Sequence, residues 1–361
     1  MQTIAVIGTR GFPGIQGGVE VHSENLYSRM KNVKLRVYRR NPYLTDSSYK
    51  KYNNIEYVDL PSTRIKGLEA ILHTFISVLH ILFHRVDIVH IHNIGPGLFT
   101  PLLKFFGLKV VLTYHSPNYE HKKWGWFARN LLRLGEYLSL NYADRIIFVN
   151  KTQMQKFSAR RQAKSVHIVN GITPQERSSS HDYVDSLGLK KGEYLLSVGR
   201  LTPEKGFEYL VEAVNKVDEI KQVVIAGAGD HGDSYKRELQ KIDVNKKVVF
   251  AGFVFGENLR QLYSNARMYV LSSVNEGFPL VLLEAMNYQL PIVASNIPAT
   301  QIPQLTADDY FESGNADSLS MKLKEKWEGA PAVRMYDLAE YDWERIADRT
   351  IEVYESLFER K

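Results

Sequence analysis

Short apolar runs alternate with longer amphipathic stretches along most of this 361-residue chain. The runs are rich in β-branched residues and show no polar alternation, as at Thr3–Gly8, Asp87–His92 and Lys109–Tyr114. Runs of this kind are typical of parallel strands that helices cover on both faces of a sheet. Their alternation with helical stretches predicts a doubly wound α/β architecture.

The alternating pattern stops near the middle of the chain and then begins again. Asn170-Gly171 and the polar stretch Thr173–Asp182 are typical of a linker, and a new strand is expected at Tyr194–Val198. The chain length also suits two domains. We therefore expect two Rossmann-like domains, residues 1–170 and 171–340, that face each other across a cleft. Ligands bind beyond the carboxyl ends of parallel strands, so this cleft is the expected ligand site.

The composition excludes several kinds of site. The chain has no cysteine, which rules out a thiolate nucleophile, cysteine-bound zinc and disulfides, and which suits a reducing cytoplasm. The N-terminal sequence MQTIAVIG enters a strand directly and does not resemble a signal peptide. The longest apolar stretch, Leu68–Phe83, is interrupted by polar residues and is shorter than the ~20 residues of a spanning helix. We expect a buried helix there and a cytoplasmic protein.

Charge is distributed unevenly along the chain. Residues 1–170 carry 24 Lys and Arg against 10 Asp and Glu, a net charge of +14, whereas residues 171–361 carry 22 against 30, a net charge of −8. A basic half favours an anionic partner such as a nucleic acid, a membrane surface or a phosphorylated lipid, although solvated lysines are the simpler explanation. Nucleic acid is the poorest candidate, because no recognition motif accompanies the charge.

The first loop contains five glycines between Gly8 and Gly18. Gly17 and Gly18 directly precede a predicted helix, whose free N–H groups favour phosphate. The alternative is a tight turn that needs glycine only for its geometry. The loop lacks the G-x-G-x-x-G pattern of dinucleotide-binding proteins, although Arg39 and Arg40 after the second strand suit an NADP 2′-phosphate and keep a dehydrogenase as an alternative.

Polar side chains follow two of the predicted strands. His115 stands at the carboxyl end of the strand predicted at Lys109–Tyr114, where it can hydrogen-bond a substrate hydroxyl, and a packed or surface histidine is the alternative. In the second half, Arg200 and Lys205 lie just before a predicted helix. Two cations beside a helix N-terminus form a candidate pyrophosphate clamp, with exposed surface charges as the alternative.

The segment Ser116–Arg133 mixes basic and aromatic residues. This mixture is typical of a helix at a membrane surface, and equally of a helix that packs through its aromatic side chains. The candidate membrane contacts are Lys122, Lys123, Trp124, Trp126 and Phe127, aided by Arg39 and Arg40.

The most specific motif is a pair of acidic residues that flank Gly277-Phe278-Pro279-Leu280. Glu276 and Glu284 are eight residues apart, about two helical turns. If Pro279 starts the helix, Glu276 precedes it and Glu284 lies more than one turn inside it. Both carboxylates can then contact one ligand at different depths. For either residue alone, the alternative is an acid that caps the helix or lies on the surface.

These motifs together resemble a known family. The spacing Glu276-x7-Glu284, with Arg200 and Lys205 upstream and a glycine-rich loop at the start, is similar to that of retaining glycosyltransferases of the GT-B fold, family 4. The resemblance covers nearly the whole chain. It implies that the fold has two Rossmann-like domains, that residues 1–170 form the acceptor side, and that residues 171–340 bind a nucleotide sugar.

Two segments narrow the resemblance to one branch of the family. IAVIGTRGFPGIQGGVE and the stretch from His115 to Gly125 resemble bacterial rhamnosyltransferases and other polysaccharide-assembling transferases. Tyr341–Glu344 matches the start of the last helix of these enzymes, which implies that residues 341–361 return to the first domain. Ser116–Tyr119 departs from a Gly-Leu-Asp-Trp-like run that many members of the branch have, which puts the identities of the donor and the acceptor in doubt.

The resemblance implies a role for each motif residue. Glu284 is expected to bind the ribose hydroxyls, and Glu276 is expected to bind hydroxyls of the donor sugar. Arg200 and Lys205 are expected to neutralise the departing diphosphate and, with Glu276, to be catalytic. The remaining implied roles are a catalytic contact of His115 to the sugar near the reacting carbon, a diphosphate contact by Gly17 and Gly18, and donor binding by Gly277, Phe278, Pro279 and Leu280.

The resemblance implies retention by front-face attack, in which the donor phosphate takes the acceptor proton. The sequence has no Asp-x-Asp motif at a strand end, so we expect no essential metal, and we expect no cofactor because the nucleotide sugar is a substrate. The expected acceptor is a saccharide or a lipid-pyrophosphate-linked saccharide at the inner face of the cytoplasmic membrane. The alternatives are a two-domain NAD(P) dehydrogenase, a sugar-nucleotide epimerase, and a non-catalytic partner subunit with the same fold.

Overall fold

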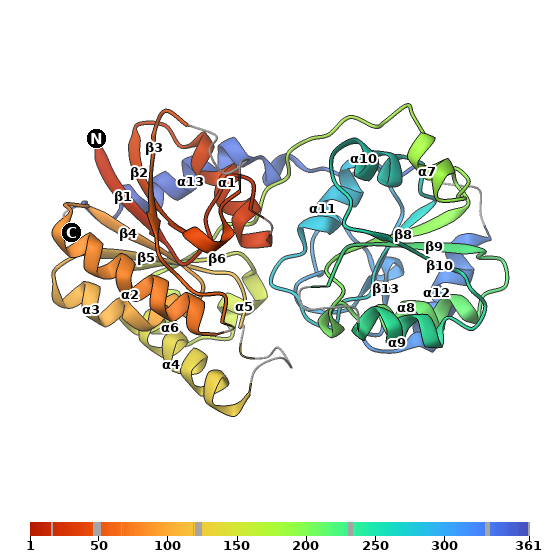
Figure 1. Ribbon diagram of the computed structural model, residues 1–361, viewed down its shortest axis with the longest axis horizontal. Coiled ribbons are helices and arrows are strands. Elements are labelled where there is room, and N and C mark those ends of the chain that lie inside the picture. The colour runs from red at the N-terminus through yellow and green to blue at the C-terminus, as the bar shows by residue number, and fades with distance from the viewer. Residues whose placement is uncertain are drawn as a thin grey trace. The chain divides into compact units, whose positions relative to one another are not determined.

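The computed structural model describes residues 1–15, 17–45, 52–65, 67–117, 119, 125–229, 234–328 and 333–359 (Figure 1). The chain forms two compact units. The first unit consists of Met1–Thr173 and Ala339–Lys361, and the second unit consists of Pro174–Leu338. The C-terminal segment therefore belongs to the unit that contains the N-terminus.

The first unit is built on a seven-stranded parallel sheet with the order β3-β2-β1-β4-β5-β6-β7. Its strands are β1 (Gln2–Ile7), β2 (Val33–Arg40), β3 (Ile55–Leu60), β4 (Ile88–His92), β5 (Lys109–Tyr114), β6 (Arg145–Phe148) and β7 (Ser165–His167). The central strands lie between two layers of helices, and Ile4–Ile7 of β1 is fully buried. Burial on both faces explains why these strands have continuous apolar sequences.

Helices cover both faces of this sheet. They are α1 (Gly18–Arg29), α2 (Leu68–Phe83), α3 (Thr100–Phe105), α4 (Trp126–Tyr142), α5 (Lys151–Gln155), α6 (Ala159–Gln162) and α13 (Trp343–Glu355). Figure 1 shows α2, α3 and α4 on one face and α1 with α13 on the other. Helix α13 packs against α1, and Ile172 and Asp342 form a parallel bridge beside the connection. The final helix thus completes the first unit.

The second unit contains a six-stranded parallel sheet with the order β10-β9-β8-β11-β12-β13. Its strands are β8 (Tyr194–Val198), β9 (Gln222–Ala226), β10 (Val248–Gly252), β11 (Met268–Leu271), β12 (Ile292–Ser295) and β13 (Tyr310–Phe311). Its helices are α7 (Asp182–Ser186), α8 (Phe207–Asn215), α9 (Ser234–Ile242), α10 (Gly256–Asn265), α11 (Leu280–Asn287) and α12 (Ala316–Trp327). Helices α8, α9 and α12 cover one face, and α7, α10 and α11 cover the other (Figure 1). Both units are therefore doubly wound, as the sequence predicts.

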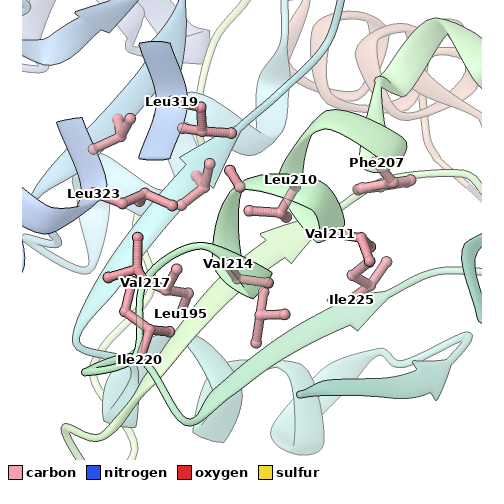
Figure 2. Packing of buried hydrophobic residues seen from close by; sticks show 14 of the residues in the cluster. Leu195, Phe207, Leu210, Val211, Val214, Val217, Ile220, Ile225, Leu319 and Leu323 are labelled. Carbon is pink, nitrogen blue, oxygen red and sulfur yellow. The ribbon is translucent and has the colours of Figure 1, made fainter. Parts of the chain in front are cut away.

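The core of the second unit shows why the sheet and its helices form together. Leu210 and Val214 of α8 pack with Leu319 and Leu323 of α12 over Leu195 of β8 (Figure 2). None of these five side chains is exposed to solvent. Apolar residues three or four apart on each helix face the sheet, so the two helices bury one continuous surface.

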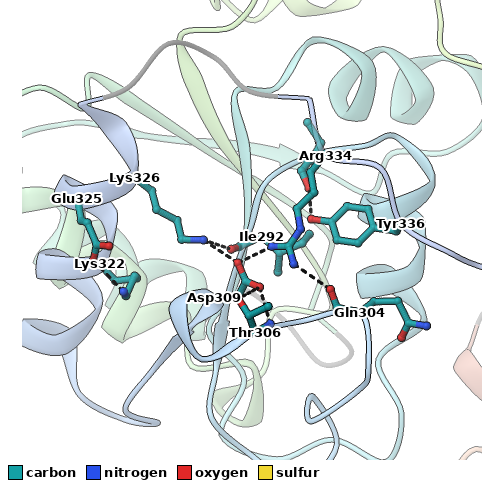
Figure 3. Close-up of polar contacts among 10 residues, drawn as sticks. Ile292, Gln304, Thr306, Asp309, Lys322, Glu325, Lys326, Arg334 and Tyr336 are labelled. Atoms are coloured by element: carbon teal, nitrogen blue, oxygen red, sulfur yellow. Dashed lines mark hydrogen bonds and ion pairs between the residues drawn. The ribbon is translucent and has the colours of Figure 1, made fainter.

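A buried carboxylate joins three segments at the edge of the second sheet (Figure 3). Asp309 precedes β13, and its side chain is only 1% exposed. It accepts hydrogen bonds from Lys326 of α12 at 2.7 Å and from Arg334 at 2.6 Å. The backbone N–H of Thr306 donates to the same carboxylate at 2.8 Å. Two cations and a backbone donor thereby stabilise the ionised form of a buried acid.

The two roles predicted for Arg39 and Arg40 are wrong. Arg39 and Arg40 are 2% and 4% exposed, so they are available neither to an NADP 2′-phosphate nor to a membrane. Arg39 lies opposite Asp59 in the β2–β3 register and forms a two-pronged ion pair with it at 2.6 and 2.8 Å. Arg40 lies 3.7 Å from Glu69 of α2. Both arginines therefore neutralise acids inside the unit.

The prediction that Leu68–Phe83 is a buried helix is wrong for one face. Leu72, Phe75 and Leu79 are about two-fifths exposed, and Phe83 is 86% exposed. Helix α2 lies in the outer layer of the unit, so only the face toward the sheet is covered. Among the described helices, none has both the length and the apolar content that crossing a membrane requires.

Candidate functional site

Three histidines from separate elements meet in the first unit. His92 ends β4, His115 follows β5, and His22 lies on α1. All three side chains are buried, and His115, with 8% of its surface accessible, is the most exposed. The His22 and His115 rings meet edge to face at 4.9 Å between centroids. His115 is therefore part of a histidine cluster at the carboxyl ends of neighbouring strands, which is the edge where open parallel sheets bind ligands.

Hydrogen bonds fix the orientation of these rings. His92 Nδ1 lies 3.0 Å from His115 Nε2, and His92 Nε2 lies 2.6 Å from the Tyr27 hydroxyl. Tyr27 in turn contacts His90 Nδ1 at 2.9 Å. His22 Nδ1 lies 2.8 Å from the side-chain oxygen of Asn170, which is an acceptor, so this nitrogen carries the proton. The network holds His115 through a chain that reaches into the core of the unit.

Burial makes the cluster electrically neutral. Desolvation lowers the pKa of His22 to about 4 and that of His90 to about 3, and it lowers the pKa values of His92 and His115 well below their usual value. Neighbouring histidines disfavour protonation further, because each added proton would face another positive ring. At neutral pH, His115 offers hydrogen bonding without a formal charge.

The glycine-rich loop brings an acid to the start of α1. Gly17 is the residue before the helix, with φ 145°, and a Cβ there would lie 2.0 Å from Glu20 Oε2. Glu20 is buried, and its other oxygen accepts a hydrogen bond from the Arg10 N–H at 3.0 Å. Gly18 has open space around its Cβ position. The sequence prediction did not include Glu20, and the phosphate contact of Gly17 and Gly18 stays a prediction.

In the second unit, a short turn after β8 positions Lys205. Residues Pro203–Lys205 form a 3₁₀ turn, and Gly206 then adopts φ 60° before α8 begins. A Cβ on Gly206 would lie 2.3 Å from the Ser272 carbonyl oxygen, so only glycine allows this approach. The Ser272 hydroxyl donates to the Lys205 carbonyl at 2.9 Å. The loops after β8 and β11 are thereby fixed to each other.

Lys205 and Glu276 form an ion pair at this point. Lys205 Nζ lies 2.5 Å from Glu276 Oε1, and the two side chains are 15% and 12% exposed. The Ser273 hydroxyl donates to the same oxygen at 2.7 Å. Arg200 is more open, with 46% of its side chain exposed and Glu204 3.9 Å away. The structure therefore joins one residue of the predicted clamp to the predicted sugar-binding acid.

Glu284 lies deeper in the same region. It belongs to α11, which begins at Leu280, so Pro279 precedes the helix and does not start it. The Tyr263 hydroxyl donates to Glu284 Oε2 at 2.9 Å. Burial raises the pKa of the Glu284 carboxyl, and the hydrogen bond from Tyr263 opposes this shift. Glu276 ahead of the helix and Glu284 in its second turn are arranged as the spacing predicts.

Some residues of both regions escaped the sequence prediction. His22 and Tyr27 reach the cluster from α1, and Tyr263 reaches Glu284 from α10, so long-range packing alone brings them there. His90 and His92 carried a usable signal. Residues two apart on a strand share a face, so the pattern His-x-His at the end of β4 placed both rings on one side.

Two family models match the chain. Residues 16–176 match the model of Glycosyltransferase Family 4, and residues 181–331 match the model of Glycosyl transferases group 1. The two matches lie almost entirely in the first and the second unit, respectively. Both models describe glycosyltransferases, so each unit is similar to a domain of that class of enzyme, and two doubly wound units are the domains of the GT-B fold.

Individual relatives agree with this class. An uncharacterised glycosyltransferase of Methanocaldococcus jannaschii is 31% identical over 249 residues, which are 62% of this chain and 63% of the relative. The sulfoquinovosyl transferase SQD2 of Arabidopsis thaliana is 26% identical over 264 residues, 66% of this chain and 49% of that protein. The matches thus span roughly half to two thirds of the length of these two relatives.

Solved structures match over the full length. Sucrose-phosphate synthase from Thermosynechococcus elongatus has a TM-score of 0.78 at 22% identity, with 99% of both chains covered. HepE from Anabaena, solved with UDP and glucose, has a TM-score of 0.77 at 17% identity, with 99% of this chain and 100% of HepE covered. These neighbours confirm the expected fold of two Rossmann-like domains.

Proposed function

We propose that this chain transfers a sugar from a nucleoside-diphosphate sugar to a saccharide or lipid-linked saccharide, with retention of the anomeric configuration. The observation that carries the proposal is the arrangement of Lys205, Glu276 and Glu284 at the carboxyl ends of β8 and β11. One cation and two acids at different depths suit the three parts of such a donor, which are diphosphate, sugar and ribose.

The cations of the second unit suit a departing diphosphate. Lys205 comes directly before the turn into α8, and Arg200 lies on the same loop with nearly half of its side chain exposed. Leaving-group charge that builds up in the transition state is stabilised most by donors that are already in position. Lys205 is held by Glu276 and by the turn, so little reorganisation is needed when a phosphate oxygen joins it.

The two acids suit hydroxyl groups. A carboxylate accepts hydrogen bonds through both oxygens, so it can hold two neighbouring hydroxyls. Tyr263 occupies one oxygen of Glu284 in the free protein, and Lys205 and Ser273 share one oxygen of Glu276. We assign the ribose to Glu284 and the donor sugar to Glu276.

The reaction needs no covalent intermediate. In the proposed transfer the acceptor hydroxyl attacks the anomeric carbon, the bond to the diphosphate breaks, and the departing phosphate oxygen takes the acceptor proton. Neutral His115 donates or accepts a hydrogen bond at the sugar and adds no charge near the developing cation. Arg200 and Lys205 replace a divalent metal at the diphosphate, so the proposed reaction uses neither metal nor cofactor.

The proposed acceptor belongs to cell-surface polysaccharide assembly, with a hexose or deoxyhexose such as rhamnose as the transferred sugar. The protein would act in the cytoplasm at the inner face of the membrane. The exposed apolar residues of the first unit support such a location, since Trp126 and Phe127 at the start of α4 are 80% and 74% exposed. Lys122, Lys123 and Trp124 lie outside the described residues.

The test of the proposed reaction is a screen of purified protein against nucleoside-diphosphate sugars, first by thermal shift and then by release of the nucleoside diphosphate with saccharide and lipid-pyrophosphate acceptors. Proton NMR of the product gives the configuration at the anomeric carbon, and the proposal expects that of the donor. Inversion would contradict the retaining mechanism. Reduction of a nicotinamide or product formation without acceptor would identify a dehydrogenase or an epimerase instead.

Membrane attachment is tested by co-sedimentation with vesicles of varied anionic lipid content. We expect binding that weakens as salt rises, because each Lys or Arg near an anionic surface contributes roughly 1 kcal/mol and salt screens the attraction. Trp126→Ser with Phe127→Ser should reduce binding. Met321→Ser, which changes an exposed apolar residue of α12 in the second unit, is the matched control. Absence of binding at low salt, even with a lipid pyrophosphate present, would contradict membrane attachment.

A further inference from the structure

The histidine cluster of the first unit has a geometry beyond what a sugar contact requires. His22, His92 and His115 each offer one ring nitrogen, and these three nitrogens lie within 4.8 Å of one another. The rings come from α1 and from the ends of β4 and β5, so the secondary structure of the unit fixes all three. A tetrahedral metal with ligands at about 2.0–2.1 Å needs nitrogens roughly 3.4 Å apart, which small rotations of these rings supply.

In two of the rings, the nitrogen that points away from the other two histidines (the outer nitrogen) already has the hydrogen-bond partner that a metal site requires. His22 Nδ1 donates to the Asn170 side-chain oxygen at 2.8 Å, and His92 Nε2 lies 2.6 Å from the Tyr27 hydroxyl. Metal-binding histidines usually hold the other ring nitrogen in this way, which fixes the ring and leaves the lone pair of the inner nitrogen for the ion.

The inner nitrogen of His22 has no partner of its own. His22 Nε2 is buried and makes no hydrogen bond with any described residue. A neutral ring whose proton is on Nδ1 carries a lone pair on Nε2, and a buried acceptor without a partner costs about 1–3 kcal/mol. A metal ion bound at this place would accept the lone pair of this nitrogen and so satisfy it.

We propose that His22 Nε2, His92 Nδ1 and His115 Nε2 form a binding site for a divalent transition metal of the zinc class. Three imidazoles favour zinc, cobalt, nickel or copper over magnesium and calcium, which prefer oxygen ligands. In the metal-free protein, His92 Nδ1 and His115 Nε2 share one proton across 3.0 Å. On metal binding that proton moves to the other nitrogen of its own ring, so that His92 is protonated on Nε2 toward Tyr27 and His115 is protonated on Nδ1. The fourth ligand is water, which enters on the side of His115.

A metal at this site would regulate the enzyme by inhibition. This part of the inference rests on the proposed function, in which His115 contacts the donor sugar, whereas metal binding itself does not. An ion on His115 Nε2 fixes the ring and places a positive charge beside the carbon that becomes cationic during transfer. Zinc is therefore expected to lower the rate in proportion to the occupied fraction.

The binding test uses the purified full-length chain after removal of metals, titrated with Co²⁺ at neutral pH. A tetrahedral cobalt site gives visible absorption bands, and we expect them to saturate at one equivalent and to disappear when Zn²⁺ is added. His22→Gln should abolish the bands. Asn170→Ala leaves all three ligands in place and should weaken binding by about 10–100-fold, since it removes only the partner of His22 Nδ1.

His73→Gln is the matched control, because His73 is a buried histidine of the same unit that lies outside the cluster. Circular dichroism of each variant reports whether the fold is kept. Absence of saturable bands in the wild-type protein, or bands that persist in His22→Gln, would overturn the metal site.

The second arm measures transfer with and without Zn²⁺. We expect zinc to inhibit the wild-type enzyme and to leave the residual activity of His22→Gln unchanged. Cobalt bands without zinc inhibition would confirm the site and overturn the inhibitory role together with the assignment of His115. Failure of the proposed function would appear separately, as absence of transfer with every donor in the metal-free protein.

Discussion

The candidate regions of the two units do not follow the net charge of the halves of the chain that carry them. Residues 1–170 have a net charge of +14, yet their strand ends gather histidines that burial keeps neutral. Residues 171–361 have a net charge of −8, yet Arg200 and Lys205 place two cations beside β8. The net charge of a domain therefore describes its surface and not its site. The anion-binding site is expected where individual cations are held, in the acidic unit.

The two regions also differ in how they tolerate burial. The histidine cluster avoids the cost of desolvating a charge by remaining unprotonated, and His92 and His115 satisfy each other by hydrogen bonding. Lys205 and Glu276 instead form an ion pair over a short contact with some access to solvent. An approaching diphosphate can recruit Lys205 because the turn and Glu276 already hold its ammonium group in place. The neutral cluster is suited to hydroxyl groups or to a metal.

Replacing Arg200 and Lys205 should have the largest effect, because these two cations distinguish the second region from the neutral histidine cluster. The double variant Arg200→Ala/Lys205→Ala should lower the transfer rate by about 100-fold or more, since each charged hydrogen bond contributes roughly 1.5–3 kcal/mol. Steady-state release of the nucleoside diphosphate measures the effect, and circular dichroism checks the fold. Lys216→Ala is the control, because Lys216 pairs with Asp317 on the surface of the same unit. Full activity of the double variant would show that these cations do not hold the donor.

Much of the fold could be predicted because the central strands are apolar on both faces. The predicted ranges Lys109–Tyr114 and Tyr194–Val198 coincide with β5 and β8. Two strands escaped prediction, β7 with three residues and β13 with two. A run of two or three residues is too short to show a periodic hydrophobic pattern. Its strand conformation comes from pairing with the neighbouring strand at the sheet edge.

The candidate regions were predictable where neighbours in sequence form them. Glu276 and Glu284 belong to one loop and the helix that follows, so their spacing fixes their arrangement. The contacts of Lys205 with Glu276 and of His115 with His22 join residues far apart in the sequence, and packing alone decides them. The burial of Arg39 could not be predicted from the sequence for the same reason, since its partner Asp59 lies on the next strand.

Acid should affect the two units in different pH ranges. Burial lowers the pKa of His73 in α2 to about 4, so its contribution to stability is complete above the unfolded value of 6.5 and is lost as pH falls toward 4. Because the unfolded chain takes up this proton first, the free energy of unfolding of the first unit has fallen by about 2 kcal/mol by pH 5 through this one group. The neutral His22 shifts stability in the same direction.

The second unit responds to acid differently. Hydrogen bonds from Arg334 and Lys326 outweigh burial and lower the pKa of Asp309, so its contribution is complete above 3.8 and is lost only below that value. Hydrogen exchange followed by mass spectrometry, corrected for intrinsic rates, should show that opening speeds up more in β2 than in β9 as pH falls from neutrality to about 5. His73→Leu should flatten the pH dependence in the first unit alone. Equal acid sensitivity of both units would contradict the difference in burial of charge.

A smaller effect is expected when Glu284 and Glu276 are each replaced in a separate variant. Glu284→Gln should weaken binding of the free nucleoside diphosphate about tenfold, since it removes a charged partner of the ribose hydroxyls. Glu276→Gln should leave binding of the bare nucleotide unchanged and lower the rate of transfer, because the proposal assigns it to the sugar alone. Isothermal titration with the nucleoside diphosphate measures the first effect. Equally poor binding by both variants would show that the two roles are not divided between them.

The smallest expected effect is that of a chelator. Transfer should continue at an undiminished rate in excess EDTA, because Arg200 and Lys205 supply the positive charge that a divalent metal would bring to the diphosphate. Chelation would also remove any zinc-class ion from the histidine cluster, so the rate can rise but should not fall. A complete loss of activity that magnesium or manganese restores would place an essential oxygen-bound metal at the donor. A loss restored only by zinc would make the histidine cluster a required site, and the neutral region of the first unit would then carry part of the chemistry.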